Sequence, residues 1–181
     1  MLSDIFSRYD SFGFSGSRHW GQSPAPLSVA AAAVPPGSRV LVGCAKGVDA
    51  YFRLAFPSAE VFSVASGRWG VGRGAFAARS VACVRAVQSA GGLWVSFPSS
   101  PCPVGLVPSP SQSRCFSGFG SGSWASLAFA LGSGLPCLVF LGSLPVPSGW
   151  GLFPLPGLPG WFGCAAVVGA ESQQPVQLTL F

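Results

Sequence analysis

The sequence contains very little charge: Asp, Glu, Lys and Arg together make up 8% of its 181 residues. Asn is absent, and Lys, Ile and His occur once each, a bias that is typical of a GC-rich genome. Gly and Pro interrupt every apolar run, so no segment reaches the roughly 20 apolar residues that a membrane-spanning helix needs. The first residues, Met1 to Asp4, lack the basic start of a signal peptide. We therefore expect a cytoplasmic protein that makes no membrane contact.

Residues that bind metals or form disulfides are also scarce or badly spaced. The six cysteines stand far apart without a C-x-x-C pair, and the single histidine, His19, has no partner at metal-binding spacing. We expect no metal site and no cofactor, and we expect the cysteines to be small buried apolar residues. A catalytic pair of a cysteine with His19 stays open, although nothing in the sequence favours it.

The few charges are unevenly distributed. The formal net charge is +5, and nine of the ten basic residues precede residue 86. A basic half of this kind favours an acidic ligand such as a nucleotide or a nucleic acid. Scattered solubilising charge is the alternative.

Strand patterns alternate with helix patterns along the chain. The expected strands are 12–16, 39–43, 60–65, 93–97 and 136–141, and the expected helices are 27–34, 48–55, 74–90 and 123–131. Unbroken apolar strands are typical of a sheet that is buried on both faces. The sequence therefore predicts one α/β domain, residues 1–170, with a Rossmann-like open parallel sheet of about five or more strands and helices on both faces.

The chain contains three glycine-containing turns. Two of them follow expected strands, at residues 16–18 and 43–49, and the third, at residues 118–123, precedes an expected helix. The carboxyl ends of parallel strands lie at one edge of a sheet, where open α/β sheets bind their ligands. A helix N-terminus there presents free backbone N–H groups and a positive dipole end to an anion. The turns therefore predict a site for a nucleotide or for a nucleic-acid backbone.

These blocks resemble, in the same order, the Rossmann-like core of DNA-processing protein A and of the wider SLOG superfamily. Gly16-Ser17-Arg18 corresponds to the family's G-S-R, residues 42–49 look like its S-G-x-A-x-G-I-D block, and residues 76–80 are similar to F-P-x-R-N. Residues 121–127, followed by 130–139, resemble S-G-S-L-I-T-A and A-x-x-x-G-R-x-V. The resemblance covers about residues 12–142 and includes neither the sterile-alpha-like domain nor the winged helix of that family.

The resemblance implies a protein that binds single-stranded DNA or a nucleotide and acts in DNA processing, replication or repair. A related branch, the cytokinin-activating phosphoribohydrolases, carries P-G-G-x-G-T-x-x-E, whose glutamate resembles the acid or base that cleaves an N-glycosidic bond. Residues 119–126 contain no carboxylate here, and Ser80 replaces the family's usual asparagine. We therefore expect a binding protein without catalytic residues. The alternative is an enzyme or sensor for a small phosphorylated nucleotide in the same cleft.

Arg18, at a helix start, is suited to hold a phosphate with two parallel hydrogen bonds, whereas Lys46 acts as a point charge. Asp49 is the only carboxylate near the turns, and its simplest role is to cap or orient the following helix. Trp69 and Trp124 are candidates for stacking on bases. The predicted phosphate- or nucleotide-binding residues are Gly16, Ser17, Arg18, Gly43, Lys46, Gly47, Asp49, Arg79, Ser80, Gly120, Ser121, Gly122 and Ser123. For Arg79, a salt bridge on the helix face is the alternative.

Residues 171–181 form a polar stretch that cannot bury enough apolar surface to fold by itself, so we expect a flexible tail. Its last five residues, Gln177-Leu178-Thr179-Leu180-Phe181, resemble the pentapeptide Q-L-[SD]-L-F with which bacterial polymerases and repair proteins bind the sliding clamp. That resemblance implies the clamp as a partner. A last strand added to the domain's own sheet is the alternative.

Residues 144–162 alternate Pro, Gly and apolar residues, and the sequence assigns them no function. An exposed patch of this composition would mark a protein interface. On this basis, and because the chain is so apolar, we expect a homodimer.

Overall fold

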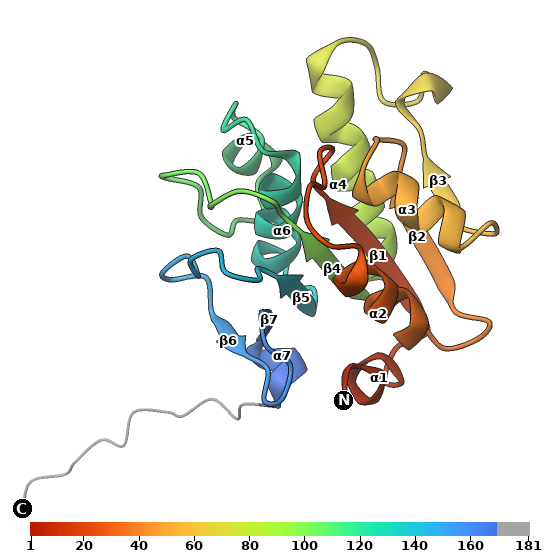
Figure 1. Ribbon diagram of the computed structural model, residues 1–181. Helices are drawn as coiled ribbons and strands as arrows, with labels where there is room; N and C mark the ends of the chain where they lie inside the picture. Colours follow the sequence, from red (N-terminus) through yellow and green to blue (C-terminus); the bar gives the residue numbers. More distant parts are fainter. Residues whose placement is uncertain (170–181) are drawn as a thin grey trace, which may run out of the picture.

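The computed structural model describes residues 1–169, so the predicted tail at 171–181 lies outside the described residues. Seven strands form one sheet in the order β3-β2-β1-β4-β5-β7-β6 (Figure 1). The first five strands in this order run parallel, and β7 pairs antiparallel with both β5 and β6. The predicted Rossmann-like open sheet is confirmed.

The strands are β1 (Ser11–Gly16), β2 (Arg39–Gly43), β3 (Glu60–Phe62), β4 (Leu93–Phe97), β5 (Cys137–Phe140), β6 (Leu152–Pro154) and β7 (Trp161–Cys164). The helices are α1 (Leu2–Phe6), α2 (Ala25–Ala33), α3 (Val48–Ala55), the 3-10 turn η1 (Val64–Ser66), α4 (Arg73–Ser89), α5 (Gln112–Cys115), α6 (Gly122–Gly132) and α7 (Ala165–Val168).

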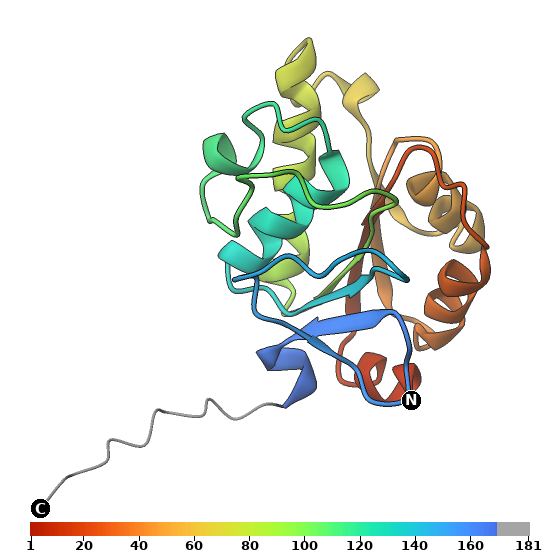
Figure 2. The ribbon, with the colours of Figure 1, turned by 60° about the vertical axis from the view of Figure 1, so that its left-hand side comes forward.

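Helices cover both faces of the sheet, and the views in Figures 1 and 2 show them on opposite sides of the strands. One apolar cluster joins α1, α2, α3 and α7 to the sheet, and a second cluster joins α4, α5 and α6 to the other face. Successive residues of β2 alternate between them: Val40 and Val42 belong to the first cluster, and Leu41 belongs to the second. This alternation explains why the strands are continuously apolar in sequence.

Aromatic stacking holds α3 against β1. The rings of Phe14 and Phe52 stack with centroids 3.9 Å apart, and both side chains are buried. This contact orients the first turn of α3, which begins at Val48, toward the end of β1. The core thus positions two of the three predicted glycine turns beside each other.

The sequence missed several elements. The third strand ends at Phe62 rather than at residue 65, because the chain turns into η1 directly afterwards. Strand β6 and the first residues of β7 arise from the Pro- and Gly-rich segment 144–162, for which no strand or helix was predicted. Helices α1, α5 and α7 are only four or five residues long. Such short elements carry too few residues for a periodic pattern and depend on tertiary packing.

Within residues 1–169, no helix combines the length and the apolar character needed to cross a membrane. All six cysteines are free thiols, and Cys83, Cys115 and Cys137 are buried, as predicted for small apolar residues.

Candidate functional site

A cavity of about 520 Å³ lies at the carboxyl ends of the parallel strands. Strand β1 lies between β2 and β4, so the chain builds the sheet outward in opposite directions from this point. Open α/β sheets bind ligands at this kind of topological switch point. The cavity is lined by Ser15, Gly16, Ser17, Arg18, His19, Ala45, Asp49, Phe76, Ala77, Arg79, Ser80, Ser99, Ser100, Phe116, Gly120, Ser121, Gly122, Ser123 and Ser126.

The turn after β1 is held by its neighbours on both sides. The Ser17 amide donates to the carbonyl of Phe97 at 2.9 Å, and the Ser17 carbonyl accepts from the Val48 amide at 3.1 Å. The Ser99 hydroxyl donates to Ser17 Oγ at 2.7 Å. These bonds link the ends of β1 and β4 to the start of α3, so the cavity floor is built from three separate chain segments.

Glycine is required where the first two turns approach each other. Gly47 has φ +68°, and a Cβ there would lie 2.3 Å from the Ser17 carbonyl oxygen. Gly43 has no room for a Cβ either, because the Asp49 carboxylate and the Arg79 guanidinium occupy that space. The two glycines therefore do not line the cavity themselves, but they leave space for the residues that do.

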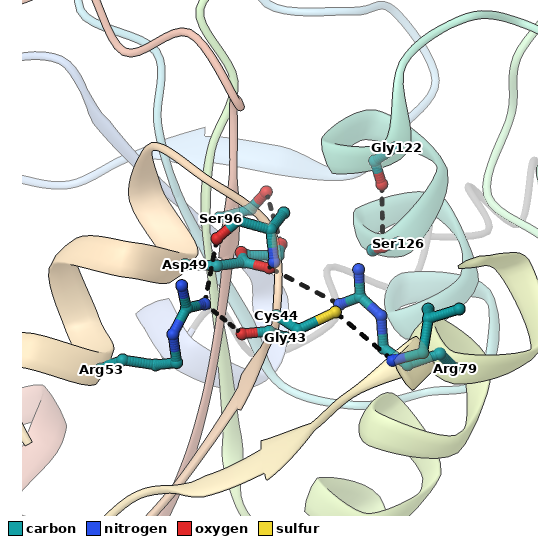
Figure 3. A network of polar contacts seen from close by, with 11 residues as sticks. Gly43, Cys44, Asp49, Arg53, Arg79, Ser96, Gly122 and Ser126 are labelled. Carbon is teal, nitrogen blue, oxygen red and sulfur yellow. Dashed lines mark hydrogen bonds and ion pairs between the residues drawn. The ribbon is translucent and has the colours of Figure 1, made fainter. Parts of the chain in front are cut away.

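A buried charge network lies between α3 and α4 (Figure 3). Asp49 Oδ2 accepts a hydrogen bond from the Ala45 amide at 3.1 Å and lies 3.6 Å from Arg79 Nη1. Arg53 Nη1 donates to the carbonyl oxygens of Gly43 at 2.7 Å and Ala45 at 3.0 Å. Asp49 therefore holds the turn between β2 and α3 and pairs with α4. No hydrogen bond from its side chain caps α3, so the capping part of the predicted role is wrong, whereas its contacts with Ala45 and Arg79 are of the kind that would orient the helix.

Arg79 is paired but incompletely satisfied. Its side chain is 10% exposed, its ion pair with Asp49 is too long for a hydrogen bond, and its Nε has no partner. Burial raises the pKa of the Asp49 carboxyl above its ordinary value, and the Arg79 guanidinium lowers it by less. Arg79 does form a salt bridge, as the alternative for this residue expected, and its partner comes from α3 rather than from its own helix. Arg79 is nevertheless one of the residues that line the cavity.

The N-terminus of α6 forms another wall of the cavity. Ser121 is the N-cap and accepts from the Trp124 amide at 3.5 Å, while its hydroxyl lies 3.2 Å from Ser123 Oγ. Gly122 and Ser123 occupy the first turn, whose amides have no acceptor within a helix. The positive end of this 11-residue helix therefore borders the cavity beside several hydroxyl groups.

Aromatic and basic side chains form the rim. The Arg18 guanidinium lies over the ring of Phe76, 5.0 Å from its centroid, and both residues line the cavity. Phe116, directly after α5, lines it as well, and so does His19. The cavity thus combines a polar floor with an aromatic rim.

The structure brings most of the predicted site residues to this cavity: Gly16, Ser17, Arg18, Asp49, Arg79, Ser80, Gly120, Ser121, Gly122 and Ser123. Gly43, Lys46 and Gly47 do not line it, and the Lys46 side chain is exposed. Trp124 is fully buried and donates to the Ser100 carbonyl, so it is unavailable for base stacking. Trp69 stacks on Phe62 outside the cavity lining.

Several lining residues were not predicted, including Ser15, Phe76, Ser99, Ser100 and Phe116. A sequence signal existed for the serines. Ser15 directly precedes the first glycine turn, and Ser99 and Ser100 follow β4, so both positions lie at carboxyl ends of strands. Phe76 begins the block that resembles F-P-x-R-N, although it was not selected as a site residue. No local pattern includes Phe116, which follows α5.

Comparison with known proteins gives no assignment, since no family model, curated protein or solved structure significantly matches this chain.

Proposed function

We propose that this protein binds a small phosphorylated nucleotide in the cavity between β1, β4 and α6. The observation that carries the proposal is the convergence of the α6 N-terminus, Arg18 and Arg79 on one cavity. The volume of about 520 Å³ suits a mononucleotide, since small-molecule sites commonly measure about 300 to 1,000 Å³. Its position at the topological switch point supports the same conclusion.

The phosphate is expected to bind at the polar end of the cavity. The first-turn amides of α6 and the hydroxyl groups of Ser121 and Ser123 are donors suited to phosphate oxygens. Arg18 is exposed and free to turn toward an anion, and a guanidinium matches two phosphate oxygens at once. The acidic residue in the lining, Asp49, is already compensated by Arg79.

The base is expected to bind at the aromatic rim. Phe76 keeps 41% of its surface exposed although it is a large apolar residue, and Phe116 borders the same cavity. Stacking of a base on an aromatic ring contributes about 1 to 3 kcal/mol. A nucleotide would therefore use both ends of the cavity, whereas inorganic phosphate would use only one.

We propose binding rather than catalysis. Cleavage of a nucleotide requires a positioned acid or base. Asp49 and His19 are the acid–base side chains in the lining. Asp49 is engaged with the Ala45 amide and with Arg79, and within residues 1–169 no hydrogen bond positions the His19 ring. A sensor or carrier role follows from this arrangement more directly than hydrolysis does.

Binding of single-stranded DNA is the second candidate, in keeping with the resemblance to DNA-processing protein A. The exposed side chains of Lys46 and Arg68 favour it, because they extend the basic surface beyond the cavity. The burial of Trp124 counts against it, because one of the two candidate stacking residues is unavailable.

Calorimetric titration with the four ribonucleoside monophosphates and with oligo-dT, at two salt concentrations, tests the two candidates. We expect one mononucleotide to bind with little salt dependence and its nucleoside to bind at least tenfold more weakly. For DNA bound along a basic surface, log affinity instead falls with log salt by about 0.7 per phosphate contact. Steep salt dependence with oligo-dT, together with no mononucleotide binding, would replace the nucleotide proposal with the DNA one.

We also propose that residues 177–181, which lie outside the described residues, bind the bacterial sliding clamp. Replacing Phe181 with Ala removes a large apolar group from the predicted clamp contact, and burying such a group contributes about 1.5 to 3 kcal/mol. We expect clamp affinity, measured by surface plasmon resonance, to fall about tenfold or more.

The melting temperature of the same Phe181→Ala variant provides the control. Clamp binding by the tail predicts an unchanged melting temperature. A large decrease together with unchanged clamp affinity would favour the alternative, in which the tail adds a strand to the sheet.

A further inference from the structure

Two cysteines face each other where the antiparallel strands join the parallel sheet. In the pairing of β5 with β7, Leu138 lies opposite Gly163. One further step in this register places Cys137, the first residue of β5, opposite Cys164, the last residue of β7. The Cys137 amide donates a hydrogen bond to Cys164 Sγ at 3.2 Å, so the Cys164 sulfur lies directly against Cys137.

This placement suits a disulfide. Directly opposite residues of antiparallel strands have Cα atoms about 4.5 to 5.5 Å apart. That separation falls within the range of about 4.4 to 6.8 Å that disulfides require. Both residues are free thiols in this structure. Formation of the bond requires the Cys137 side chain to rotate away from the Leu135 carbonyl.

The two thiols differ in accessibility. Cys164 is partly exposed, whereas Cys137 is completely buried and its thiol donates to the Leu135 carbonyl at 3.1 Å. Burial also raises the pKa of the Cys137 thiol well above its ordinary value. An oxidant from solution therefore meets Cys164 first. The Cys137 thiol is protected from solvent and must lose its proton as it attacks, so it reacts second, and only with the sulfur that lies next to it.

We propose that Cys137 and Cys164 form an oxidation-responsive pair that hydrogen peroxide converts into a disulfide. The Cys164 thiolate attacks one peroxide oxygen and the O–O bond breaks, which leaves a sulfenic acid on Cys164. The departing hydroxide takes up a proton and leaves as water. The Cys137 sulfur then attacks the Cys164 sulfur, the S–O bond breaks, and the hydroxide leaves as water with the Cys137 proton. Two thiols are oxidised, and one peroxide is reduced to two waters.

The disulfide would fix the end of β7 to the parallel sheet. It would close a segment that spans 27 positions and contains β5, β6 and β7. It would also fix the start of α7, whose Val167 carbonyl already accepts a hydrogen bond from Arg8 at 3.2 Å. Cross-linking segments of this length stabilises the folded state by restricting the unfolded chain.

Oxidation of the full chain with one equivalent of hydrogen peroxide tests the proposal. The product is alkylated under denaturing conditions, digested without reduction and analysed by mass spectrometry, and its melting temperature is compared with that of the reduced protein. We expect a peptide linking Cys137 to Cys164, with a mass lower by two hydrogen atoms. We expect the melting temperature to rise by roughly 5 to 10 °C.

Two variants separate this pair from general thiol oxidation. Cys164→Ser should lose both the linked peptide and the rise in melting temperature. Cys102→Ser removes another partly buried thiol, one whose bond goes to the Pro103 carbonyl, and should keep both responses. Oxidation of Cys164 to a sulfinic acid with Cys137 still free, or a linked peptide that joins other cysteines, would overturn the proposal.

Discussion

Replacing Arg79 with Met is expected to lower the free energy of unfolding at pH 7 by about 3 to 5 kcal/mol, the usual cost of leaving one member of a buried ion pair alone. Asp49 is 6% exposed and Arg79 is 10% exposed, so water cannot compensate for the missing charge. Met occupies a similar volume, which keeps the packing loss small. Urea unfolding followed by circular dichroism measures the change.

The size of this loss should depend on pH. In the wild-type protein the folded-state pKa of Asp49 already lies above its ordinary value of 3.8, because burial outweighs Arg79. The folded state therefore keeps the Asp49 proton to higher pH than the unfolded state does. This contribution to stability is complete below pH 3.8 and declines as the pH rises through the folded-state pKa. Removing Arg79 raises that pKa further, so the difference from wild type should be small near pH 4 and largest near pH 7.

A second substitution provides the control for this prediction. Asp49→Asn removes the charge and keeps an oxygen that can accept from the Ala45 amide. The double variant with Arg79→Met should therefore recover much of the lost stability, which a double-mutant cycle quantifies. Equal losses at pH 4 and pH 7, with no recovery in the double variant, would show that Arg79 acts through packing alone.

Replacing Arg18 with Ala is expected to weaken nucleotide binding by about 10- to 100-fold. A hydrogen bond to a charged group contributes about 1.5 to 3 kcal/mol, which corresponds to that range of Kd. Arg18 is exposed, and its observed contact is with the Phe76 ring, so the melting temperature should change little. Calorimetry with the mononucleotide that binds most tightly measures the effect.

Arg68→Ala is the matched control, because it removes the same charge from an exposed position outside the cavity lining. It should leave the Kd for the mononucleotide unchanged. Equal weakening by Arg18→Ala and Arg68→Ala would indicate a diffuse electrostatic attraction and would argue against a defined phosphate site at the cavity.

The sequence predicts the parallel part of the fold well because that part rests on local signals. The second strand, the fourth strand and α3 have the predicted bounds, since apolar runs end there at glycine turns or at prolines. The site residues at the glycine turns follow from the same rule about carboxyl ends of strands. Gly43 and Gly47 were predicted as binding residues, but they do not line the cavity, and their observed importance is that they make room for neighbouring groups.

The remaining part of the site depends on contacts that are distant in sequence. The pairing of Asp49 with Arg79 joins two helices that are separated by β3, η1 and a loop, and no spacing rule connects them. The burial of Trp124 follows from its edge-to-face contact with Trp150, with centroids 5.3 Å apart. The segment that supplies Trp150 carried no structural prediction, so the sequence did not indicate that Trp124, a candidate for base stacking, is buried.

The two outer strands of the described sheet limit how other chains can join it. Strands β3 and β6 are three residues long, and β6 ends with Pro154, which has no amide hydrogen to donate. The Arg39–Glu60 ion pair adds charge beside β3. Edge strands that are short, charged or contain proline discourage the pairing of strands between molecules. Within residues 1–169, association of a second copy through helices or loops is therefore favoured over pairing along β3 or β6.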